Sequence, residues 1–574
     1  MQVQGYPSVS YTIFTDLCRV PSETPIGMSV KSIIVFFIAF VAFTPPGLAQ
    51  KQDVPTQGTP YETTLLPGEL WWGGLSRDGS RMPYTSQTSL TRDLWANNDE
   101  NQSQPLLISN RGRYVWCEEP IKYSFQKGTL TVTSRTGVIQ NGKAGEDLQS
   151  AYAFVSKKFF PPNGRIPDPA MFSIPQYNTW IELMYDQRQD RILEYARSVI
   201  AKGYPPGVLM IDDTWQENYG TWEFSASRFP DPKAMMKELH SLGFKVMVWI
   251  CSFVSADSEN FRHLARQGGL LLRNQHGKPV DWTKNTQDQA AVIPWWNGYS
   301  ALLDLTNPET QTWFHQQLDH LTNEYGVDGF KLDAGDAKYY GDSLVSRHPA
   351  TPNDHTMLFG KIGLAYGLNE YRASFKLAGT NLVQRLSDKD HSWADLQNLI
   401  PDIVAQGLMG YAYVCPDMIG GGQWMAFREG AVVDQELVVR SAQVHALMPM
   451  MQFSVAPWRV LNAENNAICL KMAQLHQKFG AKIVALAKES AKTGEPIARS
   501  MLYNYPKSDY GKIIDQFMIG TDLLVAPAVQ KGTRSRTVTF PPGTWLGDDG
   551  SKVKGPTVQT IKVPLERLPY FTRQ

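Results

Sequence analysis

Short apolar runs alternate with stretches of helical periodicity through the central part of the chain. The runs at 208–213, 245–250 and 329–333 are the sharpest, and each ends in polar or aromatic residues. Between the first two, residues 231–242 have a helix pattern that begins at Asp-Pro and ends before a glycine. Strands that alternate with helices in this way predict an α/β domain with a parallel sheet covered by helices. We assign residues 171–492 to it.

Patterns of shorter period flank this region on both sides. Alternating runs begin at Lys122 and Thr129 before it and at Arg536 after it, with glycine- and proline-containing turns between them. We predict a linker and an all-β sandwich domain in 51–170 and a second sandwich in 493–574. Late in the central region, a long amphipathic helix is expected to bury Ile468, Met472, Leu475, Phe479, Ile483 and Leu486.

The N-terminus carries a targeting pattern. Lys31 precedes an apolar run from Ile33 to Phe43, which is followed by a Pro-Pro pair and small residues ending at Ala49. This run is too short to span a bilayer and is typical of a signal peptide, here at 28–49. We therefore predict export to the periplasm or secretion, with residues 1–50 outside the folded protein. An uncleaved membrane anchor is the alternative.

Charge and composition narrow the class of ligand. The 574 residues include 55 basic and 55 acidic side chains, so no net field attracts nucleic acid or an anionic membrane. Sixteen tryptophans exceed what packing requires and provide faces for stacking on sugar rings. Five cysteines lack the spacing of a metal site or a disulfide framework. We expect a small neutral molecule as ligand, with no metal, cofactor or nucleic acid, although most of the tryptophans will still belong to the core.

Two carboxylates occupy positions suited to glycoside hydrolysis. This reaction needs one carboxyl group that attacks the anomeric carbon and another that protonates the leaving oxygen. Asp333 ends an apolar strand, and Lys331, two residues earlier on the same side, would keep it ionised. A helix cap is its alternative role. The second carboxylate is Asp388 or Asp390, in a polar loop before a helix at 394–400, where either could be a turn or cap residue.

At these residues the chain resembles glycoside hydrolase family 31, whose members are retaining α-glycosidases. Asp333 occupies the family's nucleophile position, and Asp388, five residues before Trp393, occupies its acid/base position. Further matches in the family's order begin at Glu69 (Glu-Leu-Trp-Trp-Gly-Gly) and Pro416 (Pro-Asp-Met-Ile-Gly-Gly). The resemblance implies a (β/α)₈ TIM barrel flanked by an N-terminal and a C-terminal all-β sandwich domain.

The resemblance also implies binding residues and a substrate. Residues expected to line the pocket for the terminal sugar are Asp212, Asp213, Trp249, Trp296, Lys331 and Asp417. Lys376 or Arg385 would replace an arginine that many members use to bind substrate. The sequences of these motifs are most similar to those of members that act on α-galactosides. The resemblance therefore predicts an exo-acting α-galactosidase with a covalent glycosyl-Asp333 intermediate. An α-glucosidase or α-xylosidase of the family, or a non-catalytic carbohydrate-binding protein, are the alternatives.

Overall fold

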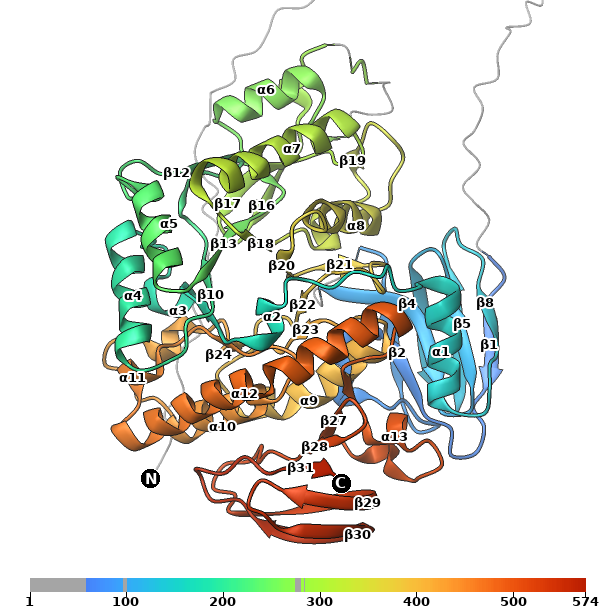
Figure 1. Ribbon diagram of the computed structural model, residues 1–574. Helices are drawn as coiled ribbons and strands as arrows, with labels where there is room; N and C mark the ends of the chain where they lie inside the picture. The colour runs from blue at the N-terminus through green and yellow to red at the C-terminus, as the bar shows by residue number, and fades with distance from the viewer. Residues whose placement is uncertain (1–57, 97–100, 274–279, 283) are drawn as a thin grey trace, which may run out of the picture. The chain divides into compact units, whose positions relative to one another are not determined.

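Nine parallel strands form one curled sheet in the described part of the chain (Figure 1). The computed structural model describes residues 58–96, 101–273, 280–282 and 284–574. The predicted signal peptide at 28–49 lies outside these residues. The strands of this sheet are β9 (Gln176–Asn178), β10 (Val208–Ile211), β13 (Lys245–Ile250), β18 (Gly329–Leu332), β20 (Leu368–Tyr371), β22 (Gln384–Arg385), β23 (Val414–Cys415), β24 (Met418–Ile419) and β25 (Gln452–Phe453).

The order of these strands shows that the barrel is closed. Pairing runs β23-β22-β20-β18-β13-β10-β9-β25-β24, and every pair is parallel. The first and last members, β23 and β24, are two halves of one chain segment interrupted only at Pro416 and Asp417. The ring therefore has eight strand positions, as predicted for a (β/α)₈ barrel. The apolar runs expected as strands became β10, β13 and β18.

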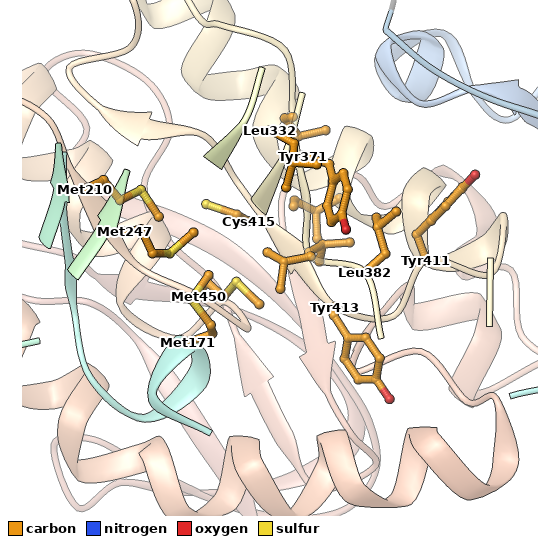
Figure 2. Packing of buried hydrophobic residues seen from close by; sticks show 14 of the residues in the cluster. Met171, Met210, Met247, Leu332, Tyr371, Leu382, Tyr411, Tyr413, Cys415 and Met450 are labelled. Atoms are coloured by element: carbon orange, nitrogen blue, oxygen red, sulfur yellow. The ribbon is translucent and has the colours of Figure 1, made fainter. Parts of the chain in front are cut away.

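Methionine and cysteine side chains fill much of the barrel interior. Met210 of β10 and Met247 of β13 are register partners, and both are completely buried. Figure 2 shows them beside Met171 and Met450, with Cys415 of β23 close by. Because methionine is unbranched and adaptable, it fills the irregular interior of the barrel. The polar side chains at the carboxyl ends of the same strands form the candidate site described below.

Helices cover the outside of the barrel. They include α4 (Gln189–Ala201), α5 (Pro232–Ser241), α7 (Pro308–His320), α8 (Pro352–Gly363), α9 (Trp393–Leu408), α10 (Gln435–Ala446) and α12 (Ala463–Thr493). The helix predicted at 231–242 is α5, and the Asp231 side chain caps it by accepting a hydrogen bond from the Ala234 amide. Between β20 and β22, residues 372–383 are all described and form no helix; they contribute β21 (Ser374–Phe375), which pairs with β4 of the N-terminal region.

The buried face of α12 overlaps only in part with the face predicted from the apolar residues. Met472 and Ile483 are buried as expected, whereas the other four predicted residues are only partly buried. The centre of the face includes small residues, and a Cβ added at Gly480 would lie 2.6 Å from the carbonyl oxygen of Ser173. The helix therefore packs closely through small side chains, with larger apolar residues along its margins.

The N-terminal region consists of two antiparallel sheets. One contains β1 (Tyr61–Thr64), β7 (Thr129–Ser134), β6 (Ile121–Gln126) and β3 (Leu90–Asp93); the other contains β2 (Trp71–Leu75), β4 (Gln102–Ser109), β5 (Arg113–Trp116) and β8 (Gln140–Lys143). The strands expected near Lys122 and Thr129 are β6 and β7. A helix that was not predicted, α1 (Leu148–Phe159), packs against this region. Trp116 stacks on Phe159 of this helix, with 4.9 Å between the ring centroids.

The C-terminal region forms one six-stranded antiparallel sheet, in the order β26-β27-β28-β31-β29-β30. Its strands are β26 (Ala498–Arg499), β27 (Phe517–Ile519), β28 (Leu523–Val525), β29 (Ser535–Gly547), β30 (Lys552–Lys562) and β31 (Tyr570–Arg573). Phe540, Trp545 and Phe571 belong to a hydrophobic cluster of its own. None of the helices in the described ranges is long and apolar enough to cross a membrane.

Candidate active site

A cavity of about 360 Å³ lies at the carboxyl ends of the barrel strands. Seven of the ten residues predicted for the site line it: Asp212, Asp213, Trp249, Trp296, Lys331, Asp333 and Asp388. The alternation of side chains along a strand explains this grouping, because residues two apart point to the same side. Lys331 and Asp333 therefore both face the barrel axis from β18, while Phe330 packs outward against Tyr366.

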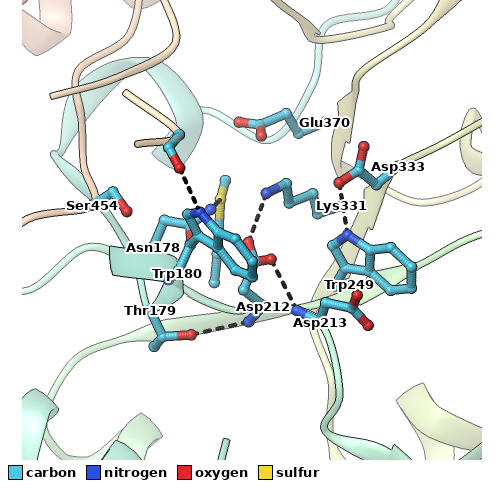
Figure 3. Close-up of polar contacts among 12 residues, drawn as sticks. Asn178, Thr179, Trp180, Asp212, Asp213, Trp249, Lys331, Asp333, Glu370 and Ser454 are labelled. Atoms are coloured by element: carbon cyan, nitrogen blue, oxygen red, sulfur yellow. Dashed lines mark hydrogen bonds and ion pairs between the residues drawn. The ribbon is translucent and has the colours of Figure 1, made fainter. Parts of the chain in front are cut away.

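The carboxylate of Asp333 is held by two neutral donors. The indole Nε1 of Trp249 donates to Oδ2 at 2.7 Å (Figure 3), and the amide of Ala334 donates to Oδ1 at 2.9 Å. Burial alone would raise the pKa of Asp333, but the positive charges of Arg372 and Lys331 outweigh it and hold the pKa below its ordinary value. Asp333 is therefore an ionised carboxylate in the cavity wall, the form that a nucleophile requires.

The carboxylate of Asp388 lies between two arginines. Arg385 Nη1 approaches Oδ1 to 2.6 Å, and Arg372 Nη1 approaches Oδ2 to 3.2 Å. Desolvation opposes ionisation, yet these guanidinium groups dominate and hold the pKa of Asp388 well below its usual range. Its side chain is still 46% exposed, so it remains accessible to a ligand. The other candidate in the loop, Asp390, does not line the cavity and accepts a hydrogen bond from Gln423 at 2.6 Å.

Arg372, which the sequence analysis did not select, joins the two candidate carboxylates. It follows β20 directly, and its Nε lies 3.7 Å from Asp333 Oδ1 while its Nη1 contacts Asp388. Asp336 supports it with an Oδ2 contact of 3.2 Å to Nε. The signal for Arg372 was present, because it is two residues after Glu370 and so shares the inward side of the strand.

Lys376 does not reach the cavity. Its ammonium group pairs with Glu118 of the N-terminal region, with 2.8 Å between Nζ and Oε2. It lies beyond β21, in the segment that pairs with β4 and leaves the barrel. Arg372, rather than Lys376, therefore lines the cavity.

Arg385 and Asp417 lie beneath the cavity and do not line it. Asp417 is fully buried, and its carboxylate accepts hydrogen bonds from Arg385 Nη1 at 2.7 Å and from the Lys389 amide at 2.8 Å. Burial raises the pKa of Asp417 to about 7. Arg385 Nε also lies 3.4 Å from the buried Glu370. These two predicted binding residues thus hold the loop that carries Asp388.

The glycines after Asp417 fit the same loop closely. A Cβ added at Gly421 would lie 2.0 Å from the carbonyl oxygen of Lys389, and one at Gly422 would lie 3.0 Å from the Asp388 Cβ. Gly421 also has a φ of +65°, which disfavours other residues. The Gly-Gly pair of this motif therefore lets two barrel loops approach around the second carboxylate.

A strand of the N-terminal region also supports both arginines. The side-chain amide of Gln102 in β4 donates to the main-chain carbonyl of Arg372 and, at 2.7 Å, to that of Arg385. Gln102 thus joins the residue that follows β20 to the last residue of β22. The N-terminal region is therefore part of the framework that positions the site.

The floor of the cavity contains a buried ion pair. Lys331 Nζ lies 2.6 Å from Asp212 Oδ2 (Figure 3), and both side chains are almost fully buried. Thr179 and the Asp213 amide orient Asp212, because its own amide donates to Thr179 Oγ1 and its Oδ1 accepts from the Asp213 amide. Such a pair is costly to bury and rigid once formed, as expected of a fixed binding surface.

Asp213 lies beside this pair, and no ion pair joins it to a cationic side chain among the residues that the structure describes. Asn297 Nδ2 donates to its Oδ2 at 2.5 Å, and the Tyr219 hydroxyl lies 3.2 Å away. Asn297 and Trp296 form the turn between β16 (Val292–Trp295) and β17 (Gly298–Leu302), so a hairpin inserted after β13 closes one side of the cavity. Burial, with the nearby Asp212 charge, raises the pKa of Asp213 to about 7.

The raised pKa of Asp213 predicts a pH-dependent change in stability. In the unfolded chain this group ionises near pH 4, so its carboxylate destabilises the fold progressively as pH rises from about 4 through 7. Asp213→Asn has no such charge and should be more stable than the unaltered protein at pH 8, by up to about 4 kcal/mol, with the difference vanishing toward pH 4. Thermal unfolding at several pH values measures this. The exposed Asp186→Asn is the control, and an equal difference for Asp213→Asn at pH 8 and 5 would contradict the assignment.

Two protein-family models match this chain. The model of the glycosyl hydrolases family 31 TIM-barrel domain matches residues 169–476, which is more than half of the chain, and that of the family's C-terminal domain matches 494–574. The chain belongs to glycoside hydrolase family 31. The resemblance of the motifs around Asp333 and Asp388 is thereby confirmed at the level of the family. Among the described residues, no group of His, Cys, Asp and Glu side chains is arranged to hold a metal ion.

The proteins most useful for comparison are named for different glycosidase activities. The mouse myogenesis-regulating glycosidase is 31% identical over 75% of this chain and 60% of its own length. Alpha-glucosidase 2 of Bacillus thermoamyloliquefaciens is 25% identical over 72% of this chain and 53% of its own. This chain thus spans little more than half the length of these relatives. A family 31 dextranase from Flavobacterium johnsoniae, solved with glucose, aligns with a TM-score of 0.77 at 20% identity, covering 90% of this chain and 66% of that one, which shows a shared fold.

Proposed function

We propose that this protein is a retaining, exo-acting α-glycosidase. The observation that carries the proposal is the pair Asp333 and Asp388, which line one cavity and are bridged by Arg372. A cavity of this size, closed below by the barrel interior, accepts the end of a glycoside rather than the middle of a chain. Family membership supports the same chemistry.

In this mechanism Asp333 attacks the anomeric carbon while Asp388 protonates the departing oxygen. The product of this step is a β-glycosyl ester of Asp333; Asp388 then removes a proton from water, which attacks the same carbon and releases a sugar of α configuration. Asp388 starts as a carboxylate because of its two arginines, so it must gain its proton in the substrate complex. Arg385 contacts the carboxylates of Glu370, Asp388 and Asp417. When Asp388 becomes neutral, the guanidinium group therefore still has two carboxylate partners.

We propose galactose as the sugar that is removed. The sequences around Asp212, Asp333, Asp388 and Asp417 are most similar to those of family members that act on α-galactosides. Other related proteins carry the names of α-glucosidases and α-xylosidases.

We also propose that the protein is exported, because residues 28–49 have the pattern of a signal peptide. Mass spectrometry of the mature N-terminus tests this proposal.

Hydrolysis of 4-nitrophenyl α-D-galactoside, α-D-glucoside and α-D-xyloside tests the proposed function. We expect kcat/KM on the galactoside to exceed the other two by at least about tenfold, because discrimination between isomeric hydroxyl groups rests on directed hydrogen bonds. Preference for the glucoside or xyloside would refute galactose and leave the mechanism. Tight sugar binding without turnover of any of the three would favour a carbohydrate-binding protein.

A further inference from the structure

Lys389, the residue after Asp388, is held by all of its polar groups. It lies in the acid loop, residues 386–392 between β22 and α9. Its amide donates to Asp417 Oδ2 at 2.8 Å, and its carbonyl oxygen accepts a hydrogen bond from the Gly422 amide at 3.1 Å. Its ammonium group lies 2.6 Å from Asp402 Oδ2. The side chain of Asp388 is 46% exposed, whereas those of Lys389 and Asp402 are 10% and 1% exposed. Lys389 is therefore the fixed point from which Asp388 projects.

The carboxylate that pairs with Lys389 is held by the N-terminal region. Asp402 belongs to α9, and the short helix η1 (Ser76–Arg81) lies directly against it. A Cβ added at Gly79 of η1 would lie 2.5 Å from the Cα of Asp402, so the two elements meet through their main chains. Burial raises the pKa of Asp402 to about 6, although the Lys389 charge and the Ser80 amide both favour its ionised form. Asp402 therefore has no room to move away from Lys389 on the side of η1.

A second ion pair fixes η1 itself. Arg92 of β3 forms a bidentate pair with Asp78 of η1, with Nε–Oδ2 and Nη2–Oδ1 distances of 2.6 and 2.7 Å. The Tyr84 hydroxyl donates to the same carboxylate at 3.3 Å. The side chain of Asp78 is 6% exposed, so water screens this pair little. A continuous line of contacts thus runs from the N-terminal sheet through η1 and α9 to the acid loop.

Stability alone does not explain a buried ion pair at this place. Burying two charges costs free energy, and apolar side chains of similar volume often stabilise a fold as well or better. An acid, in contrast, depends on exact placement, because a proton is transferred only within hydrogen-bond distance. A displacement of about 1 Å can lower a rate by about 10²-fold.

We propose that Lys389 and Asp402 are positioning residues, whose ion pair holds the main chain next to Asp388 so that its carboxyl group reaches the departing oxygen. The inference rests on the proposed function. Neither residue lines the cavity that contains Asp333 and Asp388, so both act through Asp388 and not on the substrate. Because η1 backs the pair, the N-terminal region takes part in placing the acid although both catalytic carboxyl groups belong to the barrel.

The experiment compares two substrates of the sugar preferred in the aryl panel. The α-glycosyl fluoride needs little acid assistance, whereas the leaving group of an α-linked disaccharide must be protonated. We expect Lys389→Met to lower kcat/KM by at least about tenfold on the disaccharide and by less than about threefold on the fluoride. The variant should fold, because Asp402 can take up a proton when its partner is lost. Lys482→Met of α12, which removes a 2.6 Å pair with Asp522, is the control and should change neither rate by more than about twofold.

A double variant separates positioning from a general structural role. Asp402→Asn should show the same selective loss, and Lys389→Met/Asp402→Asn should lose no more than either single variant, because the two side chains act as one unit. Losses that multiply, an unchanged disaccharide rate, or equal losses on both substrates overturn the proposal. If near-UV circular dichroism shows that a single variant is not folded, the double variant, which buries no unpaired charge, decides by the same ratio of rates. Failure of the unaltered protein to hydrolyse the fluoride refutes the proposed function itself.

Discussion

Replacing Asp333 with asparagine will reduce kcat on an aryl α-glycoside by about 10⁴-fold or more. The neutral amide cannot form the glycosyl ester, although it is nearly the same size and can still accept the Ala334 hydrogen bond. Asp336→Asn is the matched control, because Asp336 is buried and contacts Arg372 without lining the cavity. We expect the control to lose no more than about 10²-fold, by displacing Arg372.

Steady-state kinetics with near-UV circular dichroism of both variants measures this difference. Native-like spectra should accompany the loss in Asp333→Asn, since the substitution removes a charge rather than volume. Comparable activity of Asp333→Asn and the unaltered protein, or a larger loss in Asp336→Asn, would show that the nucleophile lies elsewhere.

The second large effect is expected for Asp388→Ala, and its size should depend on the leaving group. A disaccharide needs protonation of a poor leaving group, so its kcat/KM should fall by about 10² to 10⁴-fold, whereas the glycosyl fluoride needs little acid assistance and should be affected far less in the first step. Added azide should restore turnover of the fluoride, because it displaces the Asp333 ester without a general base.

The anomeric configuration of the azide product makes this prediction specific. Attack on a β-glycosyl ester of Asp333 gives an α-glycosyl azide from Asp388→Ala, whereas the same anion entering in place of the carboxylate in Asp333→Gly gives the β-glycosyl azide. Proton NMR of the two products distinguishes them. Equal losses on both substrates, without azide rescue, would remove Asp388 from the acid/base role.

The sequence located residues at strand ends better than residues in loops. Asp333, Lys331 and Trp249 were predictable because each lies within the last three residues of an apolar run, and alternation fixes which side they face. Arg372 was missed because its short strand is followed by an irregular segment and not by a helix. Nothing local indicates that this segment pairs with β4 of the N-terminal region.

Depth within the barrel was also not predictable from the sequence. Arg385 ends β22 and Asp417 lies between β23 and β24, so both are on barrel elements that surround the site, but periodicity gives the direction of a side chain and not its distance from the cavity. Asp417 sits between the two halves of an interrupted strand with a φ of +75°, which turns its carboxylate toward Arg385 and the Lys389 amide. Such supporting contacts depend on tertiary packing, as does the close approach of α12 through small side chains.

Trapping of the covalent intermediate tests the central claim most directly. The protein would be incubated with 5-fluoro-α-D-galactosyl fluoride, whose ester intermediate hydrolyses slowly, then digested with trypsin and analysed by mass spectrometry. We predict that the peptide Leu332–Lys338 gains one fluorogalactosyl group and that fragmentation places it on Asp333. A label on Asp336 or on another peptide, or turnover of a galactoside with inversion of configuration, would contradict the account.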